Sequence, residues 1–463
     1  MMKPFEIRGF NPCESLLRHT PEQLRRFIRR MKKLNMNTII IHYDYGWKRY
    51  RDLILEECRA AGVNIILMTF GPRTFLSYSD WKHSYFAKNT NGEPFTMRLE
   101  CETYPCCFEP EALAAYAYGA RQWLKELPPE IKHVHMRAAD GLMFCQCPKC
   151  RALPQNEKWQ PFVDIFTQAV LEVRSDLKFE TDVYVKRYRI PEKAQAFQHM
   201  TNIMYDTFYR KPTHTLANCT FPDPELAKEA ADAILEKEVD ADSANTYHFK
   251  RLQEWSRAFP QKVYVHENAM IQGSFGVFQH GTWSYLQDLE TFRKLGLQGV
   301  CYEAYEPGYS NFEEMFEILA KALNGEEVNY QPTETELLLR SQSGEFVGCD
   351  FPAEKYLTDP VKLKHALYYR DFIRNPDAKA YRALLTLALE NEDVLDPLFI
   401  GFRGATYGMA EGKLTFDRKQ LSPAAADLLS RRKLWDFMEE IPLNEDPYKI
   451  CRDLMTELLC KAL

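Results

Sequence analysis

The chain has 463 residues, 45% of them hydrophobic, which suffices for a large α/β domain with a packed core and a smaller appended region. The net charge of −6 at pH 7 argues against nucleic acid or an anionic membrane surface as a partner. No apolar run is long enough to cross a membrane, and residues 1–12 lack the pattern of a secretory signal. Because the chain has an odd number of cysteines, 13, we expect a reducing, cytoplasmic location.

Short apolar, β-branched runs alternate with amphipathic stretches over residues 4–325, as is typical of βα units around a parallel sheet. The expected strands are residues 4–11, 37–47, 64–72, 133–140, 179–190, 201–210, 262–270 and 299–308. About eight strand–helix units in this length predict a (β/α)8 TIM barrel. An open, doubly wound sheet shares the alternation, but no glycine-rich phosphate-binding turn follows any of these strands.

The amphipathic stretches predict helices between the strands. These helices are expected at residues 21–35, 50–63, 111–127, 162–177, 195–200, 224–238, around 252–259, 283–296 and 312–325. A polar linker follows at 324–336, and beyond it the chain is mostly helical. We therefore predict a catalytic barrel at residues 1–328 and an α-helical C-terminal domain at 329–463. The sequence leaves open whether this domain joins copies of the chain into a homo-oligomer.

Ionisable and aromatic residues follow several predicted strands, at the end of a barrel where the chemistry of such enzymes sits. They are His42, Asp44, Trp47, Arg137, Asp140, Tyr205, Asp206, His266, Glu267, Asn268, Tyr302, Glu303, Tyr305 and Glu306. Burying charges is costly, so packing alone does not select this recurrence. For single residues such as Asp44 and Asp206, a helix cap or an arginine partner explains the position equally well.

Two carboxyl groups that face one ligand are what glycoside hydrolysis requires. We predict Glu267 and Glu303 as the catalytic pair, with Asp140 orienting the substrate or tuning a pKa, and no cofactor for catalysis. The predicted substrate-binding residues are His42, Trp47, Arg137, Tyr205, Asp206, His266, Asn268, Tyr302 and Tyr305. Most aromatic residues in a chain of this size belong to the core, so packing in the core stays an alternative role for the tyrosines.

A cysteine cluster follows the fourth predicted strand. Cys145, Cys147 and Cys150 form C-x-C-x-x-C, and Cys107 from an upstream segment supplies a fourth thiol. Such a set holds a structural Zn²⁺ tetrahedrally in other proteins, but the second C-x-x-C of a zinc ribbon is absent. The sequence therefore leaves open a structural zinc site, reduced thiols without metal, and a disulfide pair.

The segment from Cys107-Phe-Glu-Pro-Glu through Asp140-Gly141 to Cys150 resembles the family of domains of unknown function numbered 4838. The eighth-strand segment GVCYEAYEPG resembles a later part of the same family. The resemblance implies a glycoside-hydrolase-like barrel over residues 1–330, similar in architecture to α-glucuronidases and β-N-acetylhexosaminidases, with some members classed as family 163 endo-β-N-acetylglucosaminidases. It departs from the substrate-assisted hexosaminidases, because Gly141 follows Asp140 where those enzymes have an Asp-Glu pair.

These observations favour a hydrolase that cleaves a β-linked amino-sugar or uronic-acid-containing oligosaccharide. A carbohydrate-binding barrel without activity is the alternative, and it predicts that the three carboxylates do not converge on one pocket or are held in pairs with arginine or lysine. A metal-dependent hydrolase would need His42, Asp44, Asp206 and His266 to converge, and no metal-binding motif supports it.

Overall fold

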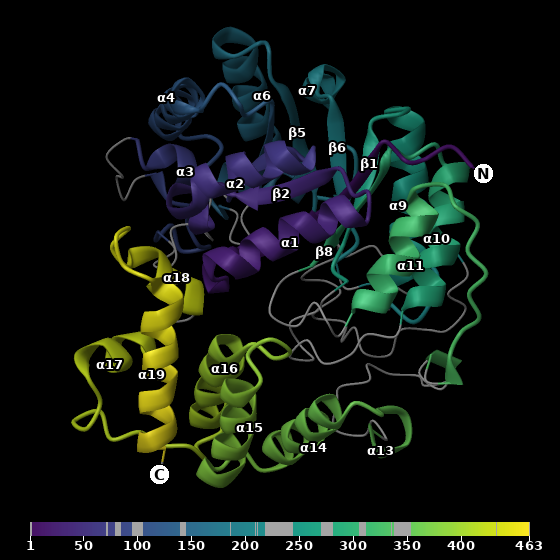
Figure 1. Cartoon of the computed structure of the whole chain (residues 1–463). Helices are drawn as coiled ribbons and strands as arrows, with labels where there is room; N and C mark the ends of the chain where they lie inside the picture. Colours follow the sequence, from purple (N-terminus) through teal and green to yellow (C-terminus); the bar gives the residue numbers. More distant parts are fainter. Residues whose placement is uncertain are drawn as a thin grey trace.

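The computed structural model contains a closed barrel of parallel strands, in which each strand pairs with the next and β8 pairs with β1 (Figure 1). The strands are β1 (Ile7–Asn11), β2 (Thr38–His42), β3 (Asn64–Phe70), β4 (His133–Arg137), β5 (Lys178–Val183), β6 (Asn202–Asp206), β7 (Val263–Glu267) and β8 (Gly299–Glu303). The structure describes residues 2–70, 73–78, 85–94, 105–138, 145–185, 187–208, 210, 212–217, 244–269, 281–304, 312–334, 336–337, 353–431 and 433–462. The predicted (β/α)8 barrel is confirmed, and closure of the sheet excludes the open alternative.

Helices surround the barrel, and all of those described were expected from the sequence except the short α3 and α5. They are α1 (Pro21–Lys33), α2 (Lys48–Ala61), α3 (Arg73–Leu76), α4 (Pro110–Glu126), α5 (Pro148–Arg151), α6 (Gln155–Val173), α7 (Gln195–His199), α9 (Ala244–Ala258), α10 (Thr282–Lys294) and α11 (Glu313–Leu323). The helix predicted at residues 224–238 lies outside the described residues. Among the helices described, none is long and apolar enough to cross a membrane.

Helix α1 shows how local sequence sets an element boundary. Thr20 precedes it in an extended conformation, and its side chain accepts a hydrogen bond from the Gln23 amide while the Gln23 side chain accepts one from Thr20. Pro21 occupies the first turn, where a missing amide hydrogen costs nothing. This capping box starts the helix directly after the first loop of the barrel.

The barrel interior and the layer outside it have separate cores. The interior cluster consists of Ile7, Ile40, Ile66, Met68, Met204, Tyr264 and Cys301. Gly9 lies among them, where a Cβ atom would come within 2.3 Å of the Cys301 sulfur, so only glycine fits. The larger cluster fills the space between the strands and the surrounding helices and includes Val263, Val265 and Tyr302. We call this cluster the outer core. Successive strand residues alternate between these two cores.

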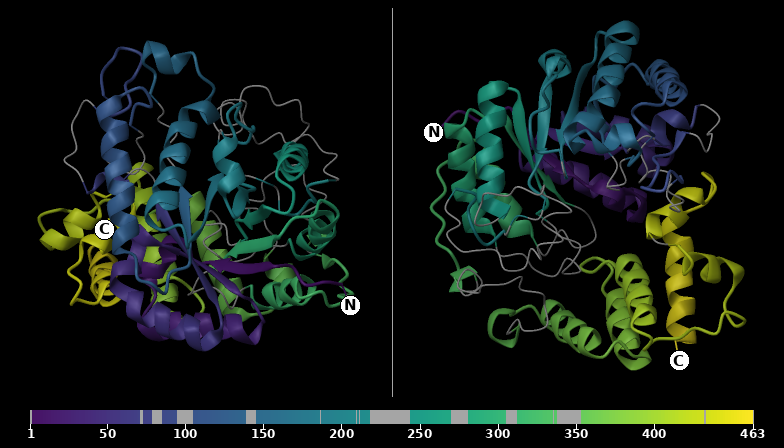
Figure 2. Two further views of the ribbon diagram at one scale, coloured as in Figure 1. Left: turned by 90° about the horizontal axis from the view of Figure 1, so that it is seen from above. Right: turned by 180° about the vertical axis from the view of Figure 1, so that it is seen from behind.

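The C-terminal helices pack on a core of their own. They are α13 (Ala353–Tyr356), α14 (Pro360–Arg374), α15 (Ala378–Glu390), α16 (Pro397–Ala410), α17 (Pro423–Leu428), α18 (Leu434–Glu440) and α19 (Pro447–Lys461). We refer to residues 353–462 as the C-terminal helical region, and it lies below the barrel in Figure 1 and in the right-hand view of Figure 2. A boundary at residue 328 falls between α11 and these helices and stays a prediction.

The C-terminal helical region touches the loops that leave β1 and β2. These loops form the short helices η1 (Cys13–Arg18) and η2 (Tyr43–Trp47), which contact α18, and η1 also contacts α19. Leu17 and Tyr45 belong to the core of the helical region. The Arg49 guanidinium donates to the carbonyl oxygens of Ile441 and Glu445, at 2.6 and 2.7 Å. The helical region therefore packs at the end of the barrel where the strands finish.

Candidate active site

Polar side chains line the inside of the barrel at its mouth, the end where the strands finish. Because strand residues alternate, residues two positions beyond the interior residues Ile40, Met204, Tyr264 and Cys301 share their face. The pairing of His135 with Met68 and of Asp182 with Met204 places Arg137 and Asp182 on the same face. This set, the inner ring, consists of Asn11, His42, Arg137, Asp182, Asp206, His266 and Glu303, and all of them are buried.

A chain of hydrogen bonds joins three of these residues across β1, β7 and β6. The Cys13 amide donates to Asn11 Oδ1 at 2.9 Å, which fixes the orientation of the Asn11 side chain. Asn11 Nδ2 therefore donates to His266 Nε2 at 2.9 Å, so the His266 proton lies on Nδ1 and is donated to Asp206 Oδ2 at 3.0 Å. These hydrogen bonds fix one tautomer of His266 at the mouth of the barrel.

Asp206 is an acceptor held from two sides. Besides His266, Asn268 Nδ2 donates to Asp206 Oδ1 at 2.9 Å. Burial favours the neutral acid, but the interaction with His266, the charge of Arg137 and the hydrogen bond from Asn268 outweigh it, and the pKa of Asp206 lies below its ordinary value. The structure thus brings three predicted residues, Asp206, His266 and Asn268, into one contact group.

Two arginines share an aromatic ring beside Asp182. The Arg137 guanidinium lies 4.7 Å from the centre of the Tyr184 ring, and the Arg187 guanidinium lies 5.9 Å from it. Arg187 is also 3.9 Å from Asp182 Oδ1, which accepts a hydrogen bond from the Ala138 amide. Within the described residues, Asp182 Oδ2 has no hydrogen-bond partner although it is buried.

His42 and Trp47, both predicted to bind substrate, lie after β2. His42 belongs to the inner ring, where burial and then the positive charge of Arg137 lower its pKa well below the ordinary value. Trp47 is buried in the large core around the barrel. Asp44 accepts a hydrogen bond from Thr74, which ties the loops after β2 and β3 together.

Glu267 and Glu303 end neighbouring strands but do not share a face. Glu267 pairs with Tyr302, which lies in the outer core, whereas Glu303 pairs with Asn11 of the inner ring. Glu267 accepts hydrogen bonds from Thr207 Oγ1 at 2.6 Å and from Arg210 at 2.7 Å. Burial raises the pKa of Glu267 to about 7, against the opposing charge of Arg210.

Two of the tyrosines predicted to bind substrate are buried and face the surrounding helices. Tyr205 donates or accepts a hydrogen bond with His248 Nδ1 at 3.0 Å, and Tyr302 packs edge-on against Tyr285. Both belong to the outer core, since each alternates with an inner-ring residue on its strand. The predicted residues Asp140, Tyr305 and Glu306 lie outside the described residues.

The cysteine cluster differs by one residue from the predicted set. The sulfur atoms of Cys106, Cys145, Cys147 and Cys150 lie within 4.8 Å of one another, whereas the prediction named Cys107 in place of Cys106. Cys106 Sγ is 3.7 Å from Cys150 and 4.0 Å from Cys147, and Cys107 Sγ is 3.7 Å from Cys150. A hydrogen bond from Cys106 and the Lys88 amide lower the pKa of Cys145 to about 4, against burial, so a thiolate is already favoured there.

Sulfur atoms bound tetrahedrally to one Zn²⁺ lie about 3.8 Å apart, since each Zn–S bond is about 2.3 Å. The four thiols suit zinc in their chemistry, and two of their six separations, from Cys106 to Cys147 and Cys150, match that spacing. Within the described residues, no other group of histidine, cysteine and acidic side chains comes close enough to hold a metal. His42, Asp44, Asp206 and His266 are therefore not brought together as a metal site.

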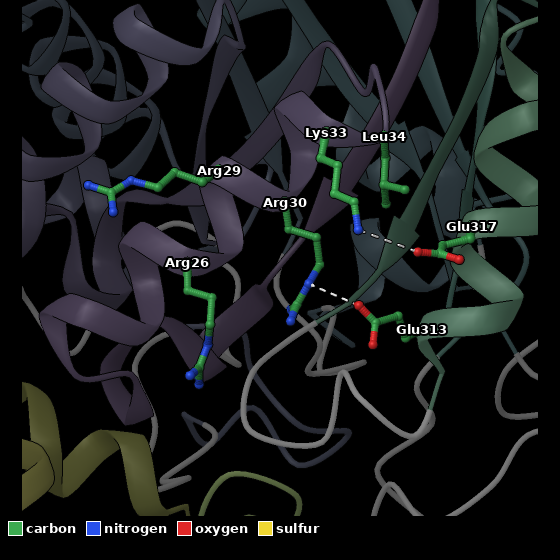
Figure 3. Close-up of a pocket in the computed structure, with 7 residues that line it drawn as sticks. All are labelled: Arg26, Arg29, Arg30, Lys33, Leu34, Glu313 and Glu317. Atoms are coloured by element: carbon green, nitrogen blue, oxygen red, sulfur yellow. Dashed lines mark ion pairs between the residues drawn. The ribbon is translucent and has the colours of Figure 1, made fainter.

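A hollow of about 320 Å³ lies outside the barrel, between α1 and α11 (Figure 3). Its lining is basic on α1 and acidic on α11, and the two sides pair through Arg30 with Glu313 and Lys33 with Glu317. None of the predicted site residues lines it. These exposed ion pairs join two neighbouring helices of the outer ring, and they contribute little each.

Solved glycoside hydrolases are similar to this barrel, while no protein-family model and no curated protein matches the chain. The chain is similar to Gan42B, a GH42 beta-galactosidase from G. stearothermophilus, at 11% identity and TM-score 0.46, over 83% of this chain and 70% of that one. It is similar to the endo-beta-1,4-mannanase of Thermotoga petrophila at 8% identity and TM-score 0.43, over 71% of this chain and 79% of that one. The resemblance to family 4838 stays a prediction. Substrate class and mechanism are therefore inferred from the side chains at the mouth of the barrel.

Several residues of the site escaped the sequence-based prediction. Asp182 carried a usable signal, because Glu180 and Asp182 alternate along β5 and so share the barrel's inner face. Asn11 ends β1 in the same way. Arg210 and Asp288 carried none, since an arginine in a loop and an aspartate on a helix are normally solvated.

A second polar layer lies deeper in the barrel, around Glu180. His135 Nδ1 is 2.7 Å from Glu180 Oε1, Tyr264 donates to the same oxygen at 2.6 Å, and His133 Nε2 is 2.9 Å from Oε2. Burial raises the pKa of Glu180, but the two histidines outweigh it and hold this pKa well below the ordinary value. Glu180 is therefore a paired carboxylate that supports the ring from below.

Proposed function

We propose that this protein is a glycoside hydrolase that acts at the mouth of the barrel, with Glu303 as one of its catalytic carboxylates. The observation that carries the proposal is the inner ring, to which β1, β2 and β4 to β8 each contribute a polar side chain on the inward face. Such a ring is expensive to bury and stabilises the fold less than apolar residues would. Convergent polar groups at this end of a barrel are typical of an active site.

Hydrolysis of a glycosidic bond needs a second carboxyl group near Glu303. The predicted partners are Glu267, which faces α10, and Asp140, which follows β4 in the sequence and lies outside the described residues. The structure adds Asp182, whose Oδ2 atom lacks a hydrogen-bond partner within the described ranges. Asp206 is the weaker candidate because His266 and Asn268 occupy its two oxygens.

An acidic sugar suits the ring better than a neutral one. Arg137 and Arg187 are both buried beside Tyr184, and a guanidinium binds a carboxylate with two parallel hydrogen bonds. This supports a uronic acid in the substrate, while the amino sugar rests on the family resemblance alone. We propose a β-linked oligosaccharide that contains one of these sugars.

A hydrolysis screen tests the function. Aryl β-glycosides of uronic acids, N-acetylhexosamines, galactose and mannose are incubated with the full chain, and release of the phenol is followed. We expect turnover with at least one acidic or amino sugar, and none in the Glu303→Gln variant. Absence of turnover on the whole panel, with sugars still raising the melting temperature, would replace the hydrolase with a binding protein.

One observation favours that second function, a carbohydrate-binding barrel without activity. Glu267 is held by Arg210 in a buried ion pair, as the binding hypothesis predicts for the carboxylates. Glu303 is the residue on which the two hypotheses differ, because only the hydrolase requires its carboxyl group to take part in a reaction.

We propose further that Cys106, Cys145, Cys147 and Cys150 hold a structural Zn²⁺. Bound there, the ion would join the segment before α4 to the segment that begins α5, and it would take no part in catalysis. A cytoplasmic location and a homo-oligomer stay predictions beside it.

Replacing Cys106 with serine is expected to abolish zinc binding, whereas Cys107→Ser leaves it intact. Cys106 belongs to the four-sulfur group and Cys107 does not, although the two residues are adjacent and both buried. Zinc content is measured by elemental analysis of protein purified without chelator. The melting temperature of Cys106→Ser should fall by about 2–4 °C per kcal/mol of lost stability. Equal zinc content in both variants would contradict the assignment.

A further inference from the structure

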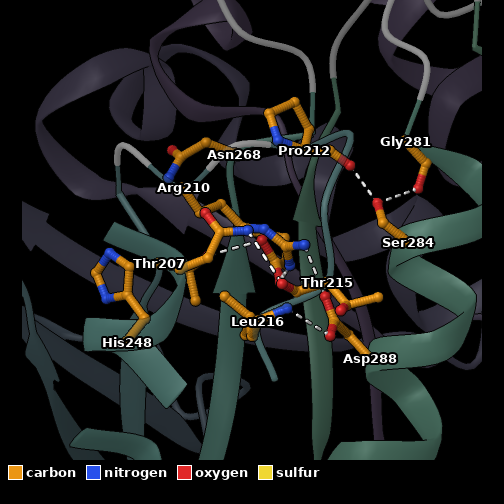
Figure 4. Close-up of polar contacts among 12 residues, drawn as sticks. Thr207, Arg210, Pro212, Thr215, Leu216, His248, Asn268, Gly281, Ser284 and Asp288 are labelled. Atoms are coloured by element: carbon orange, nitrogen blue, oxygen red, sulfur yellow. Dashed lines mark hydrogen bonds and ion pairs between the residues drawn. The ribbon is translucent and has the colours of Figure 1, made fainter. Parts of the chain in front are cut away.

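A buried arginine, Arg210, bridges two buried carboxylates, Glu267 of β7 and Asp288 of α10; Figure 4 labels Arg210 and Asp288. Arg210 Nη1 donates to Glu267 Oε1 at 2.7 Å, and Nη2 donates to Asp288 Oδ2 at 2.6 Å. The side chains of Arg210, Glu267 and Asp288 are 4%, 1% and 0% exposed. We call these three residues the triad.

The triad has one positive and two negative groups when fully ionised. The other titratable groups packed around it add no positive charge. Tyr285 of α10 and Tyr302 of β8 stay neutral, because burial and then the charge of Glu267 raise both pKa values. Burial lowers the pKa of His248 of α9 to about 4, so this imidazole is neutral as well. A net charge without compensation is costly in a buried place, so a proton on one of the carboxylates is the cheaper state. Burial also raises the pKa values of Glu267 and Asp288, in agreement with that charge balance.

The triad is joined to the ring through the ends of β6 and β7. Asp206 and His266 pair across β6 and β7 and face the barrel interior. The next residue on each chain segment, Thr207 and Glu267, faces the opposite side. Thr207 Oγ1 lies 2.6 Å from Glu267 Oε2 and 3.2 Å from the His266 carbonyl oxygen, and these two acceptors share its single hydroxyl hydrogen.

The loop after β6 is fixed by the same residues. Arg210 Nη2 donates to the His214 carbonyl at 2.8 Å, and the Leu216 amide donates to Asp288 Oδ1 at 2.9 Å. Asn245 of α9 donates to the same His214 carbonyl at 3.0 Å. One guanidinium thus ties a loop of the mouth to β7 and α10.

We propose that Arg210 and Asp288 are positioning residues for the inner ring. Through Arg210, the carboxyl groups of Glu267 and Asp288 form a pair that holds one proton between them. Loss of that proton loosens the ends of β6 and β7, which carry Asp206 and His266. The effect on stability stands by itself, whereas the effect on turnover rests on the proposed function.

The pH dependence of melting temperature tests the shared proton in the full chain. A carboxyl group whose pKa is raised by folding stabilises the protein below its ordinary pKa, and this contribution is lost as pH rises through the folded-state pKa. For Glu267 this loss of stability is expected between pH 4.5 and about pH 7, a range that we call the stability window. We expect the wild-type melting temperature to fall across this window relative to Glu267→Gln, which cannot ionise.

Asp288→Asn is the decisive variant. It removes one negative charge, so Arg210 alone neutralises Glu267, and the window should move down by about one pH unit or more. The asparagine Oδ1 still accepts from the Leu216 amide, so the loop keeps its hydrogen bond. Asp427→Asn serves as the matched control, since Asp427 forms an exposed pair with Arg431 and should leave the window in place.

Parallel pH profiles in wild type, Glu267→Gln and Asp288→Asn would overturn the shared proton. If the panel yields a substrate, the limb of the kcat/KM profile set by the triad should move with the stability window in Asp288→Asn, and Arg210→Lys should keep part of the activity. If the pH range of the stability loss moves in Asp288→Asn while the pH dependence of kcat/KM stays the same, the positioning role is overturned. A window that moves in a protein without turnover would support the triad and refute only the hydrolase.

Discussion

Replacing Glu303 with glutamine is expected to lower kcat/KM by about 10²- to 10⁴-fold, the usual contribution of a carboxyl group that transfers a proton or stabilises charge in the transition state. Glu303 ends β8 on the inner face beside Asn11, at the centre of the proposed site. The amide keeps the size of the side chain but cannot ionise or donate an acidic proton. The rate is measured on the best substrate of the panel, with the melting temperature as a check of folding.

Two aryl leaving groups of different acidity separate the roles open to Glu303. If Glu303 protonates the leaving oxygen, a nitrophenyl substrate loses less rate than a substrate with a poorer leaving group. If Glu303 is the nucleophile or base, both substrates lose rate alike. Glu317→Gln on α11 is the matched control, because this carboxylate is half-exposed beside Lys33 and should leave the rate unchanged. A Glu303→Gln variant with wild-type rate would remove Glu303 from the chemistry.

The sequence contained enough information for the barrel, because short runs rich in apolar residues, such as those of β2 and β3, alternate with amphipathic helices. The predicted strand at residues 262–270 contains β7 (Val263–Glu267), and the one at 299–308 contains β8 (Gly299–Glu303). Alternation also separates His266 from Glu267, and Glu303 from Tyr302, once the first inward residue of each strand is known. A prediction that used this alternation would have placed Tyr205 and Tyr302 in the outer core.

Contacts between distant segments could not be predicted in the same way. Arg210 and Asp288 are 78 residues apart, and nothing in either neighbourhood marks them as partners. The choice between Cys106 and Cys107 depends on how the chain turns before α4, which two adjacent cysteines do not reveal. The tautomer of His266 depends on Asn11, 255 residues away. Such details follow from closure of the barrel and not from local pattern.

Replacing Arg18 with methionine is expected to destabilise the protein by about 3–5 kcal/mol, the usual cost of removing one partner from a buried ion pair. Arg18 ends η1 and is 2.9 Å from Asp396 Oδ2, with side chains 1% and 9% exposed. Its guanidinium also lies 5.0 Å from the centre of the Phe399 ring. The variant leaves the Asp396 carboxylate buried without this charge, so unfolding in urea should occur at lower concentration.

The double variant Arg18→Met/Asp396→Asn distinguishes a buried charge from lost packing. Asp396 caps α16 by accepting from the Phe399 amide at 3.0 Å, and asparagine serves equally well at that position. If the unpaired charge causes the loss, the double variant should recover much of the stability that Arg18→Met loses. No recovery would assign the loss to packing of the long side chain against Phe399. Because η1 starts with Cys13, whose amide orients Asn11, a loosened Arg18 should also weaken the link between the C-terminal helical region and the inner ring.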